Sequence, residues 1–351
     1  MCQRSSMRKW LFFIIAFVYL AILVTTCSTP ENELHLYIWA DYIKPELIEK
    51  FEQEHNCRIV YDTFDSNESM YARLKLGVTG YDVIFPSGYT YELMLQQKML
   101  NPIPISSLSY LKNLTPHYTP EKFEEGSVIY GVPFAMSYSG IAYRKDKIKV
   151  EDQSWGIFGR LDMRGRMTML NDLRETLGAA LKYLGFSANS TNREEINQAV
   201  DQLLVWKKNL AKFESEQNKH GIASAEYIVS QGYNGDMLQV MRENSHVGFF
   251  IPQEGSIISL DYAVVPQHAP NPSLAHAFIN FLLEGAVAAE NMQFTCFPSP
   301  NQAAYALLPK ELQENPSLFP PQAILDKSEV LRYLGKDGDL YNQAWDKVKK
   351  S

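Results

Sequence analysis

The stretch LHLYIWADY, residues 34–42, decides the fold class of this 351-residue chain, because it predicts a buried strand that ends in aromatic and acidic side chains. From position 34 to position 39, aliphatic residues at even positions alternate with His, Tyr and Trp at odd positions, the period of a strand with two unlike faces. Pro45 then begins an amphipathic helical pattern, since Pro is favoured in the first helical turn. Trp39, Asp41 and Tyr42 therefore follow the carboxyl end of a strand, where open α/β sheets bind ligands.

Strand and helix patterns continue to alternate after this stretch. Further strands are predicted at residues 58–63 and 81–85, with helices at 67–76 and 91–98. Alternation of this kind predicts a mostly parallel sheet with helices on both faces.

Two longer segments predict crossings of the chain between two lobes. Residues 128–143 are β-rich and helix-poor, and residues 257–265 are long enough to be the return crossing. The remaining segments give strands at 166–170 and 246–251, helices at 173–184, 193–213, 273–283 and 286–294, and a tail that ends in a helix at 316–350. Two α/β lobes joined in this way predict a clamshell that closes around a small molecule by hinge motion. A two-domain enzyme with one lobe inserted into the other would give the same pattern.

The first 26 residues are predicted to be an export signal. Arg4, Arg8 and Lys9 precede an apolar run at residues 10–24, and small residues follow it. The sequence Val-Thr-Thr-Cys at its end is similar to the lipobox of bacterial lipoproteins, in which Cys27 would become the lipidated first residue of the mature chain. The alternative is an uncleaved anchor, because about 20 apolar residues can span a bilayer. Either interpretation predicts that the bulk of the chain lies outside the cytoplasm.

Composition and charge restrict the partners. The chain is 46% hydrophobic and 21% charged, which is typical of a globular protein. Without residues 1–26 it has 30 Lys and Arg against 40 Asp and Glu, a formal charge of −10. This balance argues against nucleic acid and favours cationic or neutral partners.

Neither a metal site nor a catalytic nucleophile is predicted. Cys57 and Cys296 are 239 positions apart, and we expect two separate thiols. No Cys/His cluster has zinc-type spacing, so no metal or other cofactor is expected. Gly-x-Ser-x-Gly is absent, and no pattern pairs a His with a Ser or Cys, so an exported hydrolase has little support.

Several motifs carry a family resemblance over essentially the whole mature chain. They include Trp39-x-x-Tyr42, the run SNESMYARL at residues 66–74, and Tyr81-Asp82-x-x-x-Pro86-Ser87. Thinner matches follow at residues 171–175, 233–235, 260–261, 279–283 and 298–301. In these motifs the chain resembles the spermidine/putrescine-binding proteins of ABC importers.

The resemblance implies an α/β fold of the two-lobed periplasmic-binding-protein clamshell type (type II), with mixed sheets flanked by helices and the ligand in the cleft between the lobes. We expect residues 34–138 and 262–305 to form the first lobe, and residues 139–261 and 306–351 the second. The expected protein is a monomer in the periplasm, held to the membrane by lipid at Cys27, that passes a polyamine to the permease and ATPase subunits of a transporter.

The resemblance also implies a set of binding residues. Aromatic residues would line the cleft, namely Trp39, Tyr42, Tyr89, Tyr233 and Phe297. The carboxylates of Asp172, Glu175 and Asp261 would bind amines, and Ser87 and Asp41 would add polar contacts. Such a set suits a polyamine, because carboxylates bind ammonium groups through charge-assisted hydrogen bonds and a desolvated ammonium over an aromatic face adds about 2 kcal/mol. Asp236, just after Asn234-Gly235, is a candidate for an additional carboxylate.

Some of these residues have a structural interpretation as well. Asp172-x-x-Glu175 is a capping-box pattern for the helix that follows. Trp39 and Tyr42 are also compatible with an aromatic core. Asp261 is harder to explain in that way, because a buried carboxylate is costly without a partner.

The chain departs from the family pattern at four positions. Ser259 and Tyr233 stand where the family has Trp, Ala40 where Thr or Ser is usual, and Leu331 where a Gln contacts the ligand. These changes predict an altered length preference or a lower affinity for the amine. The alternatives are a binder of another small solute and a ligand sensor with the same clamshell. Genes for an ATPase and two permeases beside this one would favour transport.

Overall fold

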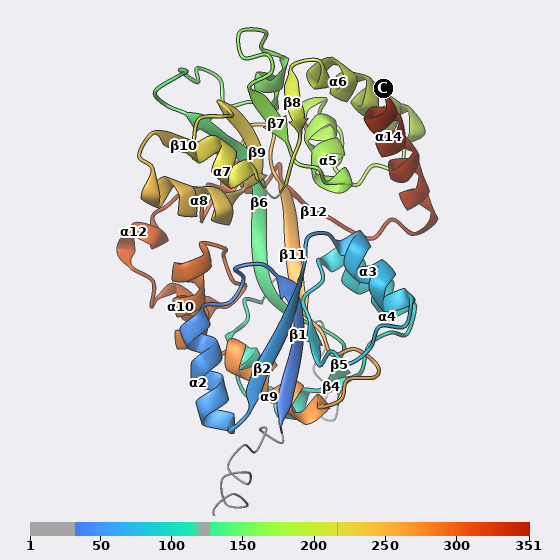
Figure 1. Cartoon of the computed structure of the whole chain (residues 1–351), viewed down its shortest axis with the longest axis vertical. Helices are drawn as coiled ribbons and strands as arrows, with labels where there is room; N and C mark the ends of the chain where they lie inside the picture. Colours follow the sequence, from blue (N-terminus) through green and yellow to red (C-terminus); the bar gives the residue numbers. More distant parts are fainter. Residues whose placement is uncertain (1–31, 117, 119–126, 216) are drawn as a thin grey trace, which may run out of the picture.

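The computed structural model describes residues 32–116, 118, 127–215 and 217–351, arranged as two lobes (Figure 1). The predicted export signal and Cys27 lie outside the described residues. Two long strands, β6 (Val132–Arg144) and β11 (Ile257–Ala263), run along the axis that joins the lobes. The two-lobed α/β clamshell predicted from the sequence is therefore confirmed.

The first lobe is built on the strand predicted at its start. The parallel sheet has the order β2-β1-β3, formed by β1 (Glu33–Trp39), β2 (Arg58–Phe64) and β3 (Val83–Ile84). Its helices are α2 (Pro45–His55), α3 (Asn67–Lys75), α4 (Gly88–Gln96), α9 (Pro272–Leu282) and α10 (Gly285–Thr295). A two-stranded sheet joins β4 (Ile103–Pro104) to β5 (Val128–Ile129), and two 3₁₀ helices follow β4, at Ile105–Ser107 and Leu111–Asn113.

Apolar residues of β1 and of two helices form the core of this lobe. Leu34 and Leu36 of β1 are fully buried together with Phe51 of α2 and Phe278 of α9. The rings of Phe51 and Phe278 meet edge to face, with 4.9 Å between their centroids. Burying such side chains stabilises the fold by roughly 1.5–3 kcal/mol each.

The second lobe has a mixed sheet of the order β12-β11-β6-β9-β7-β8, with β10 paired to β6 as well. The further strands are β7 (Met167–Met169), β8 (Leu210–Phe213), β9 (Val229–Tyr233), β10 (Val247–Phe250) and β12 (Glu329–Val330). The helices are α5 (Leu173–Tyr183), α6 (Arg193–Lys207), α7 (Asn218–Ala223), α8 (Asn234–Glu243) and α14 (Gly338–Lys350). Figure 1 shows α5, α6 and α14 on one side of this sheet and α7 and α8 on the other.

Short helices complete the chain. They are 3₁₀ helices at Trp155–Gly159 and Gly335–Asp337, and α11 (Gln302–Tyr305), α12 (Lys310–Gln313) and α13 (Gln322–Leu325). Among the described residues, no single helix is long and apolar enough to cross a membrane. Only α9 and α10 together have the length and composition of a membrane span, and they are bent by 76° relative to each other. Cys57 and Cys296 are both buried and unpaired, as predicted.

The pairing of β6 and β11 explains how the lobes are connected. The part of β6 from Val132 to Tyr138 pairs with β11, whereas its later part pairs with β9 and β10. Single bridges then connect β11 and the residue after it to the first lobe, between Ser87 and Asp261 and between Ile84 and Val264. The segments predicted as crossings are thus shared by both lobes, while the lobe boundaries stay a prediction.

One prediction about the second lobe was wrong, and some of its elements were not predicted. The helix expected over residues 193–213 ends at Lys207, because Asn209 turns the chain by donating from its side chain to the Phe158 carbonyl (3.1 Å), and β8 follows. Strand β9 was not predicted, since its buried polar residues Ser230 and Gln231 hide the strand pattern. Their side chains are satisfied by hydrogen bonds inside the lobe, which a hydropathy pattern does not show.

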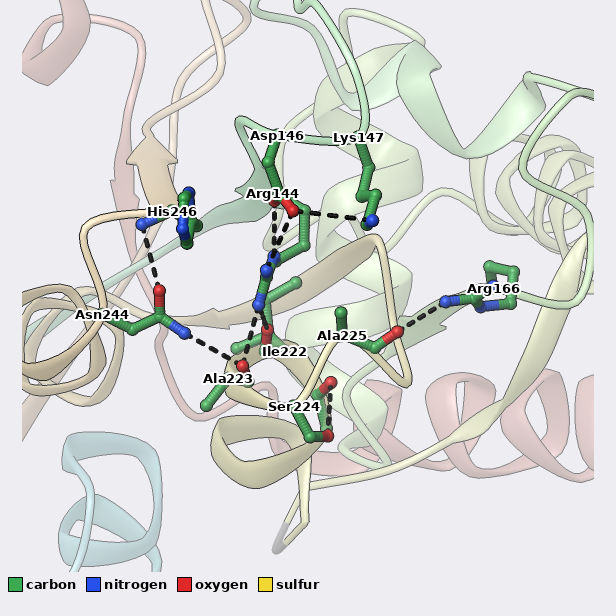
Figure 2. A network of polar contacts seen from close by, with 11 residues as sticks. Arg144, Asp146, Lys147, Arg166, Ile222, Ala223, Ser224, Ala225, Asn244 and His246 are labelled. Atoms are coloured by element: carbon green, nitrogen blue, oxygen red, sulfur yellow. Dashed lines mark hydrogen bonds and ion pairs between the residues drawn. The ribbon is translucent and has the colours of Figure 1, made fainter.

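A polar network around Arg144 fixes the turn that leads into β9 (Figure 2). The guanidinium of Arg144 is buried, binds Asp146 through two nitrogens (2.8 and 3.1 Å), and donates to the carbonyls of Ile222 (3.4 Å) and Ala223 (2.8 Å) at the end of α7. Asn244 also donates to the Ala223 carbonyl, at 2.9 Å. These contacts satisfy helix-end carbonyls, which have no partner within their own helix.

Candidate functional site

The turn after β1 holds three of the predicted residues. Trp39 is half-buried, donates from Nε1 to the Phe85 carbonyl (2.9 Å), and packs on Phe64 with 4.4 Å between ring centroids. Asp41 is exposed and has a φ of 54°, a left-handed conformation that Asp tolerates better than most residues. Tyr42 is buried behind it. Trp39 therefore has the structural contacts of a core residue on one edge, and Asp41 and Tyr42 extend the turn toward the second lobe.

Asp261 lies at the centre of the site, on β11, and is buried. Its Oδ2 accepts a very short hydrogen bond from the Tyr42 hydroxyl, and its Oδ1 accepts one from Ser259 (3.1 Å). Burial raises the pKa of Asp261, while hydrogen bonds from Tyr42, Ser87 and Ser259 act in the opposite direction. Burial also raises the pKa of Tyr42 well above its ordinary value. Ser259, which stands where the family pattern has Trp, thus orients the Asp261 carboxylate through a hydrogen bond.

Ser87 and Tyr89 are held by a residue to which the sequence analysis gave no role. The side chain of Asn67, which is buried, donates to the Ser87 hydroxyl (3.1 Å) and the Tyr89 hydroxyl (3.0 Å), and accepts from the Ser87 amide (3.0 Å). Tyr89 in turn donates to Glu68, at 3.3 Å. Asn67 and Glu68 both lie in the run at residues 66–74 that resembles the family. This resemblance was the signal that could have identified them.

Asp172 and Glu175 stand at the first turn of α5. Asp172 is the N-cap residue, because its Oδ1 accepts from the amides of Arg174 (2.8 Å) and Glu175 (3.0 Å). The helix cap predicted at Asp172 is therefore confirmed. Glu175 is buried, and within the described part of the chain its Oε2 has no hydrogen-bond partner. Burial, and then the neighbouring Asp172, raise the pKa of Glu175 well above its ordinary value.

Arg174 is a second residue that the sequence analysis missed. Its guanidinium lies over the ring of Tyr89 of the first lobe, 5.5 Å from the centroid, and over the ring of Tyr341, at 4.8 Å. It donates to the Arg332 carbonyl and to Asn189, both at 3.0 Å. Arg174 therefore joins α5 to the tail of the chain and contacts the first lobe, but its hydrogen bonds do not go to the site carboxylates.

Tyr233, Asp236 and Phe297 surround the start of α8. Tyr233 is the N-cap residue of this helix, and its pKa is raised well above the ordinary value by burial and then by Asp172 and Glu175. Asp236 forms an ion pair with Lys219 of α7, at 3.2 Å. Phe297 packs between the lobes, since its ring contacts Tyr42 at 5.9 Å between centroids and leaves no room for a Cβ at Gly235.

The structure brings the predicted carboxylates and tyrosines to one place. Asp261 contributes to the raised pKa of Glu175, and both contribute to that of Tyr233, together with Tyr89 of the first lobe. Of the departures from the family pattern, Ala40 is exposed and Leu331 is buried in the core of the second lobe.

The arrangement is suited to a cationic group. In the described part of the chain, no Lys or Arg forms an ion pair with Asp261, Asp172 or Glu175. A buried carboxylate without a cation is costly, and an ammonium from a ligand would remove this cost. No group of three or more potential metal-binding residues exists among the described residues.

A small cavity lies beside this site within the first lobe. Its lining is mostly apolar and includes Tyr42, Phe134, Met292 and Phe297, with Asn291 as a polar member. None of the carboxylates lines it, so the cavity has no charge that would hold an amine.

Comparisons with known proteins agree on one group. The family described as "Bacterial extracellular solute-binding protein" matches residues 46–320. The chain is 30% identical over 346 residues to the spermidine/putrescine-binding periplasmic protein of Salmonella typhimurium, covering 98% of this chain and 99% of that one. It is similar to the structure of a protein of Listeria monocytogenes assigned to spermidine/putrescine ABC transport, with a TM-score of 0.84, 31% identity and coverage of 91% and 99%. The TpPotD lipoprotein of Treponema pallidum gives a TM-score of 0.79, 34% identity and coverage of 90% and 99%.

Proposed function

Because the chain belongs to the bacterial extracellular solute-binding proteins, we propose that it binds a linear polyamine, putrescine or spermidine, between its lobes and delivers it to the permease of an ABC importer. It performs no chemistry on the ligand and uses no cofactor. The proposal is supported by relatives that are named for these amines and that match this chain over almost their whole length.

The environment of Asp261 carries the proposal. This buried carboxylate is oriented by two hydroxyls, from Tyr42 and Ser259, neither of which neutralises its charge. An ammonium group would supply the missing charge through a charge-assisted hydrogen bond. The neutral aromatic faces of Tyr42 and Phe297 nearby suit the methylene chain that separates two amines.

Binding would favour the closed arrangement of the lobes. Asp172 and Glu175 come from the second lobe and Ser87 and Tyr89 from the first, so a ligand that contacts both groups has more contacts when the lobes are closed. A ligand shifts a conformational equilibrium only through such a difference in affinity. The permease would then recognise the closed form.

Titration calorimetry tests this function. The chain is stripped of bound ligand by partial unfolding and refolding, and then titrated with putrescine, spermidine, spermine and lysine. We expect tight binding of at least one polyamine and weak or no binding of lysine, whose carboxylate would face the carboxylates of the site. Absence of heat with every polyamine, in protein with a cooperative unfolding transition, would redirect the search to other solutes.

We further propose that lipid at Cys27 anchors the protein to the membrane and that it acts as a monomer. The basic residues and the apolar run before Cys27 support the anchor, and a solved relative is itself called a lipoprotein. Mass spectrometry of the protein from the membrane fraction should show a mature chain that begins at Cys27 and carries the mass of the lipid. A chain that keeps residues 1–26 would favour an uncleaved anchor. Light scattering of the solubilised protein should give the mass of one chain.

A further inference from the structure

One carboxylate of the site already has an ammonium partner from the chain itself. The Nζ of Lys219, on α7, lies 3.2 Å from Oδ1 of Asp236 in the first turn of α8. The two side chains are 33% and 24% exposed, so this ion pair is neither at the open surface nor in the core. The charge of Asp236 is therefore balanced before any ligand arrives.

Asp236 belongs to the site rather than to the outer surface. Burial raises its pKa, Lys219 acts against this effect, and Asp41 of the first lobe adds to it. Asp236 also contributes to the raised pKa of Tyr42, the residue that donates to Asp261. The next residue toward the N-terminus, Gly235, packs directly against Phe297. Asp236 thus faces the first lobe at the end of the site formed by the β1 turn.

Besides Asp41 in the turn after β1, the site offers three acidic positions, and among the described residues one of these three is paired with a lysine of the chain. Asp261 is hydrogen-bonded by hydroxyls, and the position formed by Asp172 and Glu175 lies beside Arg174, whose guanidinium donates to Asn189 and a backbone carbonyl instead. Of these three positions, Asp236 alone forms an ion pair with a lysine in the part of the chain that the structure describes. A ligand ammonium that reached Asp236 would have to displace Lys219 or lie next to its like charge.

We propose that Lys219 determines ligand specificity by occupying Asp236, so that the site accepts two ammonium groups and discriminates against a third. This inference rests on the proposed polyamine function and names the preferred class as diamines. A diamine places one ammonium at Asp261 and the other at Asp172 and Glu175. The third charge of a triamine meets Lys219, and repulsion between like charges opposes its binding.

Removal of the lysine charge tests the inference. Lys219→Met keeps an unbranched side chain but frees Asp236, and the affinities for putrescine and spermidine are measured by titration calorimetry. We expect spermidine to bind about tenfold more tightly and putrescine to change by less than about threefold. The matched control is Lys212→Met, because Lys212 of β8, the last strand in the order of the sheet, pairs with Glu214 just after that strand (2.6 Å). This control should leave the ratio of the two affinities unchanged.

A double variant separates this mechanism from a general effect of net charge. Lys219→Met with Asp236→Asn removes both partners and should abolish the gain in spermidine affinity. An equal gain for both amines, or a gain that persists in the double variant, would overturn the role of Lys219. If the unmutated chain binds neither amine, the proposed function and this inference both fall. If it binds putrescine and the ratio does not respond to Lys219→Met, only the inference falls.

Discussion

The network around Arg144 and the carboxylates between the lobes are both clusters of charged side chains in the interior. They differ in whether the chain itself supplies a partner of opposite charge. Arg144 has a carboxylate, Asp146, and two backbone carbonyls as partners (Figure 2). In the part of the chain that the structure describes, the carboxylate of Asp261 accepts only from hydroxyls, and Oε2 of Glu175 has no hydrogen-bond partner. Neither forms an ion pair within the described residues, although the charge of Arg174 lowers the pKa of Glu175. Buried charge that supports a fold is normally paired within the chain. Charge left without a counter-ion is available to a ligand.

The pKa values of the two clusters reflect the same difference. Arg144 lowers the pKa of Asp146 to about 2, so this carboxylate is stabilised in its charged form. Burial raises the pKa values of Asp261, Asp172 and Glu175, so the folded protein disfavours their charged forms. The first cluster stabilises the fold at neutral pH, and the second reduces its stability until a cation binds.

The largest effect is expected from Asp261→Asn. This change keeps the shape of the side chain and removes the central charge, so polyamine binding should weaken about 1000-fold, or roughly 4 kcal/mol, in titration calorimetry. The stability of the ligand-free chain should not fall, because a costly buried charge is lost.

Asp201→Asn is the control for this experiment, since Asp201 lies on α6 with 73% of its side chain exposed. It should leave the affinity unchanged. Equal losses in both variants would mean that the total charge of the protein, rather than the position of Asp261, attracts the amine.

Arg144→Met should have the opposite profile. It removes the donor of the carbonyls of Ile222 and Ala223, and hydrogen bonds from a charged group contribute about 1.5–3 kcal/mol each. We expect the free energy of unfolding, measured with urea, to fall by about 3 kcal/mol. Amine affinity should stay the same in protein that is still folded.

Arg160→Met is the matched control for Arg144→Met. Arg160 binds Asp162 through two nitrogens, with the same spacing of two residues, but is 39% exposed. Exposed ion pairs contribute about 0–1 kcal/mol, so the loss should be small. A similar loss for both arginines would show that burial is not what makes the Arg144 network important.

Tyr42→Phe tests the hydroxyl that orients Asp261. Loss of this hydrogen bond leaves the carboxylate charged but less well positioned, and polyamine affinity should fall about tenfold. Tyr305→Phe, which loses a hydroxyl bonded to the Ser299 carbonyl at 2.8 Å, should change the affinity by less than about twofold. A site that depends on aromatic contacts alone would not respond to Tyr42→Phe.

The smallest effect per step is expected from pH. The pKa values of Asp261 and Glu175 are raised above the ordinary carboxyl value of about 4. As the pH falls from 7 toward that value, these carboxylates in the folded, ligand-free protein therefore take up protons before those of the unfolded chain do. The cost of burying these charges therefore disappears as the pH falls, and amine affinity falls with it by a few-fold per pH unit. Calorimetry at pH 7, 6 and 5 measures the decline. Asp146 should keep its stabilising charge until the pH approaches about 2. An affinity that rises on acidification would contradict the role given to the carboxylates.

Much of the fold could be predicted because its signals are local. The alternation at residues 34–39 and the proline at position 45 placed β1 and α2, and the motif at Asp172 placed the cap of α5. Strand β9 could not be predicted, since the side chain of its Gln231 is satisfied only by partners more than 50 positions away, such as the Ser139 hydroxyl and the Glu175 carbonyl. The same limit hid Asn67, whose hydrogen bonds to Ser87 and Tyr89 span 20 and 22 positions.

The sequence by itself determined the two α/β lobes, the crossing strands and the chemical types of the site residues, because period, turn residues and charge act over a few positions. Only the tertiary structure decided which charges have partners. Three interactions depend on which segments meet in space. They are the hydrogen bond from Arg144 to the Ala223 carbonyl, the ion pair of Asp236 with Lys219, and the hydrogen bond from Tyr42 to Asp261 across 219 positions. Electrostatic free energy depends on those distances and on burial, and neither is a property of one segment of chain.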